Sequence, residues 1–424
     1  MTRTHRLALS VVLIASLLLG LSASIYAKEI TLRFWAIGDR MQAELLEKIF
    51  SDFTKEHPNI KVQLTMNAEW EDHYQKTLIA VAGGTPPDII RSKDFWVPEF
   101  ASRGAIEDLD KWVAADPSME IVPEEFWPVR WEQSSYQGKL YSLPWTTFTQ
   151  LFFYNEELFE NAGIGGPPDT WEELRLYALK TTDVDNKQWG TCLYTYDRVG
   201  PPMTEFWEIL LMQAGGSMMN ADATEFTFAS EAGVEALTHQ LDMIYKDGSM
   251  MPPEFASLTQ PIERGKIAMW YSGPWLFNSL PAQFPDLRWK AALMPENKSR
   301  ATYATGNNLV MMSGSKNKEA AWELLKFMFR AEYDFEWNAL GGYLPSRRSN
   351  LDIAPFTTDP NWMVAKAQFM RDDTVPRPYP LGFNEIHNKI AAWLQKAYLN
   401  RVSPAEALRA AQDEANQLLK TLNQ

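Results

Sequence analysis

The stretch EITLRFWAIGDRMQAELLEKIFSDFTKEHPNIKVQLTM, residues 29–66, decides the fold class. Its first part alternates apolar and polar side chains, with Ile30, Leu32 and Phe34 on one face, which predicts a β-strand. Its middle repeats apolar residues every four positions, which predicts an amphipathic helix that ends before Pro58. Its last part alternates again. A strand, a helix and a strand in this order indicate a parallel sheet with helices on both faces.

The same alternation of elements continues in the next part of the chain. Residues 71–84 are typical of a helix closed by glycine, and residues 86–92 are typical of a short buried strand. Ligands of parallel sheets bind at the carboxyl ends of the strands. The loops at residues 36–40, 66–70 and 91–96 are therefore the predicted edge for a site.

A second α/β unit begins with a predicted strand at residues 150–154, which leads into several helices. Thr170, with Glu173 three residues later, forms a capping-box pattern at the start of one of them. Two further strands are predicted at residues 264–273 and 286–295. We therefore expect two α/β units.

The first 27 residues have the three parts of a secretory signal. Arg3 and Arg6 make a basic start, residues 7–21 form an uncharged apolar run, and small residues lead to Ala27. The apolar run is shorter than the about 20 residues that a membrane span needs. We expect residues 1–27 to be a cleaved signal peptide; an uncleaved membrane anchor is the alternative.

Composition and charge disfavour several classes of function. The net charge of −14 argues against nucleic acid and anionic membrane surfaces as partners. Cys192 is the only cysteine, so no internal disulfide can form. The histidines lie far apart in the sequence, without the spacing of metal ligands. We therefore expect neither a metal nor another cofactor.

Residues 154–182, YNEELFENAGIGGPPDTWEELRLYALKTT, resemble the signature segment of the family 1 extracellular solute-binding proteins. Other matching pieces occur in the order of that family: FTKEHPNIKV, AGGTPPDII, GAIEDLD, GKLYSLPW, GKIAMWYSGPW, GNNLVMM and GGYLPSR. The chain is thus similar to the sugar-binding subunits of bacterial ABC importers, of the maltose-binding-protein type.

The resemblance implies a two-lobe periplasmic-binding-protein fold, similar to type II, with the ligand in a cleft between α/β lobes. The expected hinge segments are residues 144–148, 294–300 and 342–346. The expected N-lobe consists of residues 28–143 and 301–341, and the expected C-lobe of residues 149–293 and 347–424. The implied partners are a carbohydrate and the permease subunits of an ABC transporter, for a monomer in the periplasm.

A sugar-binding cleft needs aromatic rings against the C–H faces of the sugar, and polar or charged groups for its hydroxyls. The chain has 17 Trp, 15 Tyr and 22 Phe, many of them at predicted strand ends. The predicted ligand-binding residues are Asp39, Arg40, Trp70, Asp94, Trp145, Phe148, Tyr196, Trp275, Asn307, Tyr343 and Phe383.

Each of these residues also has a structural interpretation. A solvated turn or a helix cap is the alternative for Asp39 and Arg40, and a helix cap is the alternative for Asp94. Turn chemistry is the alternative for Asn307. The alternative for the aromatic residues is packing in the core, which is also the expected role of Trp207.

Three aromatic residues stand together in MWYSGPW, and their roles are expected to differ. In a strand over residues 267–271, Trp270 and Tyr271 face opposite sides of the sheet, so at most one of them reaches the cleft. A Gly-Pro corner then turns the chain. Trp275 is therefore expected beside the cleft, at a position where the resemblance implies a ring that stacks on sugar.

The sequence leaves three functions to be weighed. The leading hypothesis is a binding subunit that captures a sugar or oligosaccharide by hinge closure and delivers it to a permease, without catalysis. A secreted glycan hydrolase or lyase is an alternative, although no local motif marks the carboxylate pair that a hydrolase needs. The third hypothesis keeps the family and changes the ligand to a polyamine, a metal or glycerol phosphate.

Overall fold

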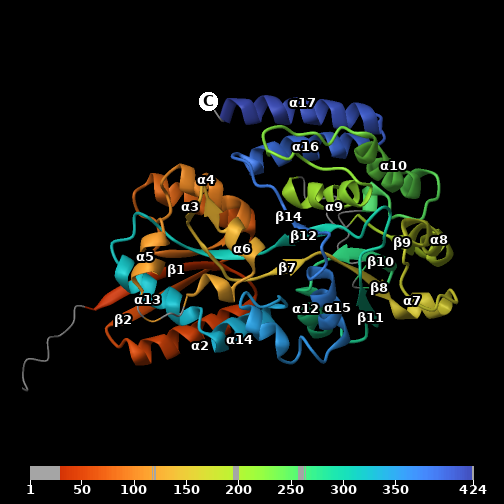
Figure 1. The fold of residues 1–424 in the computed structure, drawn as a ribbon. Helices are drawn as coiled ribbons and strands as arrows, with labels where there is room; N and C mark the ends of the chain where they lie inside the picture. The colour runs from red at the N-terminus through yellow and green to blue at the C-terminus, as the bar shows by residue number, and fades with distance from the viewer. Residues whose placement is uncertain are drawn as a thin grey trace, which may run out of the picture.

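The computed structural model describes residues 29–116, 118, 121–193, 200–255, 262 and 264–422. Two α/β halves lie side by side, with strands running from one to the other (Figure 1). We call the half that contains the amino-terminal sheet the N-lobe and the other half the C-lobe. The predicted signal peptide, residues 1–27, lies outside the described residues. Within the described ranges, no helix has both the length and the apolar character of a membrane span.

The N-lobe is built on a five-stranded sheet in the order β2-β1-β3-β13-β6. β1 pairs in parallel with β2 and with β3, as the strand, helix and strand pattern predicts. β13 and β6 add antiparallel pairs. The strands are β1 (Ile30–Ile37), β2 (Ile60–Asn67), β3 (Ile89–Lys93), β6 (Leu143–Pro144) and β13 (Asn307–Met311).

Helices cover both faces of the N-lobe sheet. Successive apolar strand residues such as Ile89 and Ile90 point to opposite faces, so each face needs a cover and each has its own core. One face carries α2 (Arg40–Glu56), α13 (Lys318–Met328) and α14 (Ala331–Gly341), and the other carries α3 (Trp70–Ala82) and α4 (Val97–Ser102). Met41 begins the four-residue apolar repeat that predicts α2, but it is 39% exposed, because the first turn of this helix lies beside the cavity between the lobes.

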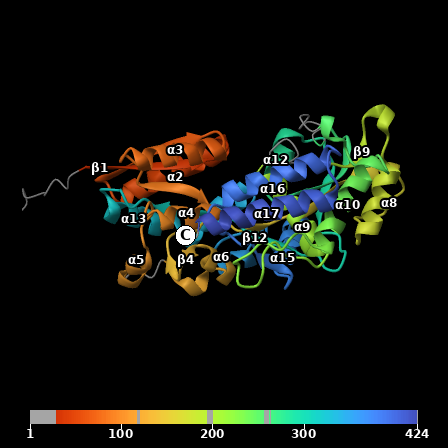
Figure 2. The ribbon, with the colours of Figure 1, turned by 90° about the horizontal axis from the view of Figure 1, so that it is seen from above.

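The C-lobe is built on a four-stranded sheet in the order β11-β8-β10-β9. Its strands are β8 (Leu151–Asn155), β9 (Trp189–Thr191), β10 (Ile267–Ser272) and β11 (Trp289–Ala292). One core packs against α8 (Trp171–Thr181), α9 (Pro201–Gln213), α10 (Glu231–Tyr245), α16 (Phe383–Tyr398) and α17 (Pro404–Leu422). The opposite core packs against α12 (Leu276–Gln283) and α15 (Pro360–Phe369). Figure 2 shows α16 and α17 side by side along the C-lobe.

Shorter elements complete the two lobes. The remaining helices are α5 (Asp110–Ala115), α6 (Pro128–Gln133) and α7 (Glu156–Asn161), and β4 (Ser135–Tyr136) pairs with β5 (Lys139–Leu140). Short 3-10 turns stand at Asp94–Trp96, Pro123–Glu125, Val184–Asn186, Pro253–Phe255 and Arg348–Asp352.

Among the described residues, three segments pass between the lobes. The first passage contains β7 (Phe148–Thr149) and the second contains β12 (Thr302–Thr305), and these two strands pair in antiparallel. β14 (Thr374–Pro376) pairs in parallel with the other edge of β12. The third passage follows α14, where Leu344 forms a bridge with Thr147 of the first passage. The lobe limits drawn from the resemblance remain a prediction.

The second passage lies later in the chain than expected. The predicted hinge segment 294–300 stays on the C-lobe, because the Met294 amide donates to Gln368 Oε1 and the Arg300 amide donates to Asp373 Oδ2, both at 3.0 Å. The chain changes lobes between β12 and β13, at Gly306.

His73 is a buried neutral base under the N-lobe sheet. It is 0% exposed, its Nε2 donates to the Arg91 carbonyl oxygen, and its Nδ1 accepts from Asn67 Nδ2, each at 2.8 Å. Burial lowers the pKa of His73 to about 4. The bond from Asn67 needs the neutral ring, whereas the bond to the Arg91 carbonyl oxygen is kept in either state, so it is mainly burial that opposes protonation.

The free energy of unfolding is expected to fall as the pH decreases from about 6.5 to about 4. In this window the unfolded chain takes up a proton at residue 73 that the native protein does not, and this stabilises the unfolded state. The resulting loss of folding free energy is absent above about pH 6.5 and grows as the pH falls to about 4. One such group contributes a slope of about 1.4 kcal/mol per pH unit. Urea unfolding between pH 4 and 7 should show a shallower slope for His73→Gln than for the wild type or for His57→Gln, which replaces a less buried histidine. Equal slopes in all three proteins would refute this.

Candidate functional site

A cavity of about 380 Å³ lies where the passages between the lobes meet. Its wall takes residues from α2, α3, β3 and α14 of the N-lobe, from α9 and α12 of the C-lobe, and from the passages. Seven of the predicted residues lie on this wall: Asp39, Trp70, Asp94, Phe148, Trp275, Asn307 and Tyr343. The structure thus brings together residues that are far apart in the sequence.

Three predicted residues lie elsewhere, and a fourth is not described. Arg40 points into solvent and pairs with Glu44 on the next turn of α2 (3.0 Å). Trp145 is 1% exposed and stacks on Trp337 in the N-lobe core, with ring centroids 4.0 Å apart. Phe383 is 2% exposed and packs on Phe95. Tyr196 lies outside the described residues.

Asp39 caps a helix and also lies on the cavity wall. It is the N-cap of α2, where its Oδ1 accepts from the Gln42 amide (2.8 Å), and it also lies on the cavity wall. A capping carboxylate is held in one orientation by the helix that it caps. Asp39 can therefore meet a ligand without a large loss of side-chain freedom.

Asp94 is the most heavily bonded carboxylate on the wall. It is 1% exposed, and its Oδ2 accepts from Arg130 Nη1 (3.0 Å), Thr305 Oγ1 (2.7 Å) and the Gly306 amide (3.0 Å). Among the described residues its Oδ1 accepts only from the Phe95 amide (2.9 Å), which leaves acceptor capacity on this oxygen. Asp94 thus links the N-lobe to the second passage and can also accept a bond from a ligand hydroxyl.

Arg130 is the buried partner that holds Asp94. Its side chain is 0% exposed, and it also donates to Gln133 Oε1 (2.6 Å) and Asn308 Oδ1 (2.8 Å). Burial lowers the pKa of Arg130, and the charge of Asp94 opposes this change. Gly306 lets the chain pass this pair, because a Cβ there would stand 2.0 Å from the Thr146 carbonyl oxygen and 2.5 Å from Arg130 Nη2.

The aromatic part of the wall is formed by Trp275, Phe148 and Tyr343. Phe148 meets Trp275 edge to face, with centroids 5.3 Å apart at 90°, and its centroid lies 5.9 Å from that of Tyr343. Trp275 stands at the N-cap of α12, directly after the corner that follows β10. The flat face of a ring such as that of Trp275 suits the C–H face of a sugar ring.

Trp270 and Tyr271 face opposite sides of the C-lobe sheet, as the alternation predicts. Trp270 is 0% exposed and stacks on Phe153, whereas Tyr271 is 9% exposed and packs in the core on the other face, beside Phe152. Neither of them lines the cavity. Trp275 is therefore the member of this group that a ligand can contact.

Two glycines fix the position of Trp275. A Cβ on Gly273 would stand 2.0 Å from Cζ3 of the Trp275 ring, so only glycine lets the ring lie against this corner. Gly342, on the third passage, has φ +75°, and a Cβ there would stand 2.5 Å from Trp275 Cα. The third passage therefore packs directly against the residue that carries the ring.

The C-lobe side of the wall contains charged residues that the sequence analysis missed. Arg377 donates from Nε and Nη2 to the two carboxylate oxygens of Glu208, each at 2.8 Å, and its Nη1 lies 3.6 Å from Glu205 Oε2. Burial alone would raise the pKa of Glu208, but Arg377 and His387 hold it well below its usual range. Glu205 also accepts from Gln150 Nε2 (2.8 Å). No local signal marks these charges, since the prolines beside Arg377 and the Gly-Pro-Pro start of α9 before Glu205 indicate only a loop and a helix start.

Charges of both signs lie on the cavity wall. Asp39, Asp94 and Glu205 are negative, and Lys93 and Arg377 are positive. Lys93 lies 5.2 Å from the ring centroids of both Trp70 and Phe95. In the part of the chain that the structure describes, no three His, Cys, Asp or Glu side chains gather as a metal site would require. The wall therefore suits a polar ligand without a large net charge.

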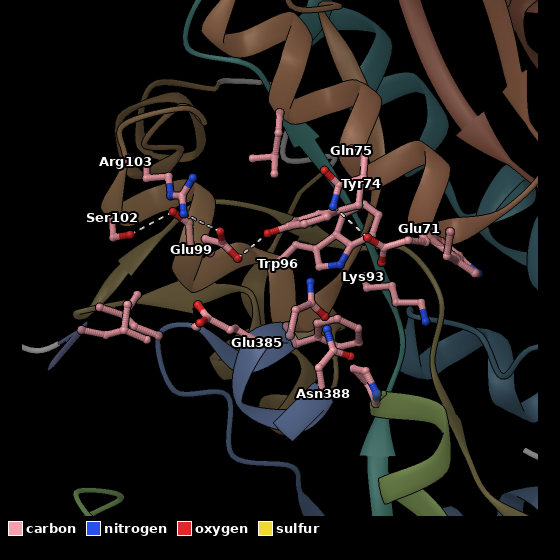
Figure 3. Close-up of a pocket in the computed structure, with 18 of the residues that line it drawn as sticks. Glu71, Tyr74, Gln75, Lys93, Trp96, Glu99, Ser102, Arg103, Glu385 and Asn388 are labelled. Carbon is pink, nitrogen blue, oxygen red and sulfur yellow. Dashed lines mark hydrogen bonds and ion pairs between the residues drawn. The ribbon is translucent and has the colours of Figure 1, made fainter. Parts of the chain in front are cut away.

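A larger hollow of about 1110 Å³ adjoins the cavity and shares four of its wall residues: Trp70, Lys93, Phe95 and Pro202. In Figure 3, residues of α3 and α4 face Glu385 and Asn388 of α16 across it. Glu99 accepts from Tyr74 Oη at 2.6 Å and pairs with Arg103 at 2.8 Å. The hollow leaves room for a ligand longer than the cavity itself.

Comparisons with known proteins agree with this architecture. The sequence model of the bacterial extracellular solute-binding proteins matches residues 38–334. A putative binding protein of Brucella abortus (strain 2308) is 26% identical over 392 residues, which are 88% of this chain and 89% of the relative. The diacetylchitobiose binding protein DasA of Streptomyces coelicolor is 26% identical over 416 residues, which are 93% of this chain and 91% of the relative.

A solved structure shares the fold over nearly its whole length. An ABC transporter solute-binding protein from Thermotoga lettingae, bound with α-D-tagatose, has a TM-score of 0.82 and is 27% identical; the match covers 92% of this chain and 99% of that chain. This likeness confirms the predicted two-lobe α/β fold class. The chain belongs to the family of bacterial extracellular solute-binding proteins.

Proposed function

We propose that this protein captures a sugar or oligosaccharide in the cavity between its lobes and delivers it to the permease of an ABC transporter. One observation carries the choice of ligand: the Trp275 ring and the carboxylates Asp94 and Glu205 face the same cavity from both lobes. Rings cover the apolar faces of a sugar, and the carboxylates accept bonds from its hydroxyls. The names of two compared proteins point the same way, since one binds diacetylchitobiose and the other holds α-D-tagatose.

The size of the cavity agrees with a small carbohydrate. Its volume of about 380 Å³ is near the lower end of the roughly 300–1,000 Å³ range of ligand pockets. The adjoining hollow gives the rest of a longer sugar a route out of the cavity. We infer that the ligand enters between open lobes and stabilises the closed form, because it contacts residues on both sides.

The mixed charges of the wall favour a neutral sugar over the other ligands considered. A phosphate ligand would need basic groups to bind its oxygens, but Arg377 already donates to Glu208 through two nitrogens. A polyamine would be served by carboxylates, but Asp94 is already bonded to Arg130. We infer binding without catalysis, by a monomer that works in the periplasm, since the family and the compared proteins are binding proteins.

Isothermal titration calorimetry against a ligand panel tests the proposal. The panel holds D-tagatose, N,N′-diacetylchitobiose, maltose, maltotriose, sn-glycerol 3-phosphate and spermidine. We expect one carbohydrate to bind with a Kd of about 1 μM or tighter, which corresponds to about −8 kcal/mol, and to change the tryptophan emission. Binding of only the phosphate or the amine would refute the sugar assignment. Release of reducing ends during incubation with the glycans would refute the inference of binding without catalysis.

A further inference from the structure

Arg91, on β3, is a buried cation without a carboxylate partner among the described residues. Its side chain is among the largest that are fully buried, at 1% exposure. The other two arginines at the site differ from it, since Arg130 pairs with Asp94 and Arg377 pairs with Glu208. A buried charge without an opposite charge is costly unless polar groups and aromatic rings surround it. A residue that carries this cost directly behind a ligand cavity needs a functional explanation.

Neutral acceptors and rings surround the Arg91 guanidinium. Nη1 donates to the Ile37 carbonyl oxygen (2.6 Å), and Nη2 donates to Asn307 Oδ1 (2.6 Å) and to Tyr343 Oη (3.1 Å). The guanidinium carbon lies between 5.3 and 5.6 Å from the ring centroids of Trp70, Trp145, Trp337 and Tyr343. Cation–π contacts of this kind stabilise a buried guanidinium.

The bonds of Arg91 decide which way its two polar neighbours point. A guanidinium donates hydrogen bonds and cannot accept them. The oxygen of the Asn307 amide must therefore face Arg91, and its NH2 group is turned away from Arg91. The Tyr343 oxygen must also accept from Arg91, which leaves its own proton for another partner. Both residues line the cavity, and among the described residues neither the Asn307 NH2 group nor the Tyr343 proton has another partner.

We propose that Arg91 is a positioning residue that makes Asn307 and Tyr343 hydrogen-bond donors toward the ligand. The part of the ligand that meets them must then offer acceptor oxygens, such as a ring oxygen, a glycosidic oxygen, a carbonyl or the lone pairs of a hydroxyl. Asp94, which accepts from the Gly306 amide beside Asn307, and Glu205 on the C-lobe only accept. The cavity wall thus offers donors as well as acceptors to a ligand, and we call Asn307 and Tyr343 its donor side. The identity of the ligand as a sugar rests on the proposed function, but the donor side does not.

Arg91 contacts all three passages between the lobes. Trp145 lies on the first passage, Asn307 follows β12 on the second, and Tyr343 lies on the third. The donor side is therefore built at the hinge, and the contacts of Arg91 keep its members together.

The first test replaces Asn307 by Asp, which keeps an oxygen for Arg91 and replaces the NH2 donor by an acceptor. Without any ligand, we expect Asn307→Asp to raise the unfolding temperature or leave it unchanged, because Arg91 gains a carboxylate partner. A lowered unfolding temperature would mean that Arg91 does not gain from an acceptor at this position, and it would overturn the proposal. With ligand, we expect a loss of affinity of about tenfold or more; unchanged affinity would also overturn it.

The second test is a double-mutant cycle between Arg91 and Tyr343. The probe is the compound of the six-member panel that the wild type binds. A sugar and the phosphate both offer acceptor oxygens, so failure of the sugar assignment through binding of the phosphate does not affect this test. Binding of spermidine alone would overturn the proposal, because its ammonium groups only donate. We expect Tyr343→Phe to weaken binding about tenfold in the wild type and in Arg91→Lys, because lysine also only donates. In Arg91→Gln the effect should fall below about threefold, because glutamine can donate to Tyr343 or accept from it. The same fold-change in all three backgrounds would overturn the proposal.

Arg347 provides the matched control for the loss of a buried arginine. It is 8% exposed and its Nε donates to the Phe329 carbonyl oxygen (2.7 Å), but it does not line the cavity. Arg347→Lys and Arg347→Gln should lower the unfolding temperature without changing the effect of Tyr343→Phe. A change as large as the one in Arg91→Gln would show that any buried arginine acts in this way, and it would overturn the assignment of the role to Arg91.

Discussion

Replacing Asp94 by Ala is expected to lower the free energy of unfolding by about 3–5 kcal/mol and to remove ligand binding. The stability loss follows because Arg130, whose side chain is 0% exposed, would keep its charge without a carboxylate partner. Thr305 Oγ1 and the Gly306 amide would also lose the oxygen to which they donate. The loss of binding follows because Asp94 lies on the cavity wall and ties the second passage to the N-lobe.

Urea unfolding and calorimetry measure these two effects separately. Thr305→Val removes one of the donors to Asp94 and is expected to cost only about 1 kcal/mol. Asp185→Ala, at an exposed position, is the control and should change stability by less than about 0.5 kcal/mol. A loss below about 1 kcal/mol in Asp94→Ala would show that Arg130 does not depend on this carboxylate.

Replacing Trp275 by Ala is expected to weaken ligand binding about 100-fold, or by about 2–3 kcal/mol, while most of the stability is retained. The Trp275 ring is partly exposed on the cavity wall and meets Phe148 edge to face. A bound sugar would therefore be its main further contact. Calorimetry with the carbohydrate that binds the wild type measures the affinity, and thermal unfolding without ligand measures the stability.

Two further variants define what this result would mean. Trp393→Ala removes a partly buried ring from α16 that does not line the cavity, so affinity should not change. Gly273→Ala keeps the Trp275 ring but forces it to move, and affinity should fall by about tenfold. If Trp275→Ala instead cost several kcal/mol of stability with little change in affinity, the ring would be a core residue.

The parallel start of the fold could be read from the sequence because local patterns determine it. The alternation at Ile30, Leu32 and Phe34 and the stripe of α2 are visible within a few residues, and they gave the pairing of β1 with β2. The order of the N-lobe sheet could not be read in this way. β13 joins this sheet through pairs with β3 and β6, and the hydrophobic pattern of a strand does not identify its neighbours.

The candidate site was predictable where a residue follows a strand directly, as Asp39, Asp94 and Trp275 do. Trp145 was misplaced because a position beside a hinge does not say which side of the chain faces the cavity. Its ring turns inward and stacks on Trp337. Glu205, Arg91 and Arg377 were missed for a different reason. They depend on partners far away in the sequence, and no local pattern marks a charged residue that will be buried.

The placement of β13 also bears on how the chain is made. Asn307 lies 216 residues after Arg91, so the strand that completes the N-lobe sheet leaves the ribosome after most of the C-lobe. Until then the edge of β3 has no neighbour, and an open strand edge favours association with other chains. Pairing over such a distance is also slow. The half of the molecule that is synthesised first is thus finished late, and the growing chain needs protection from aggregation until residue 311 has been added.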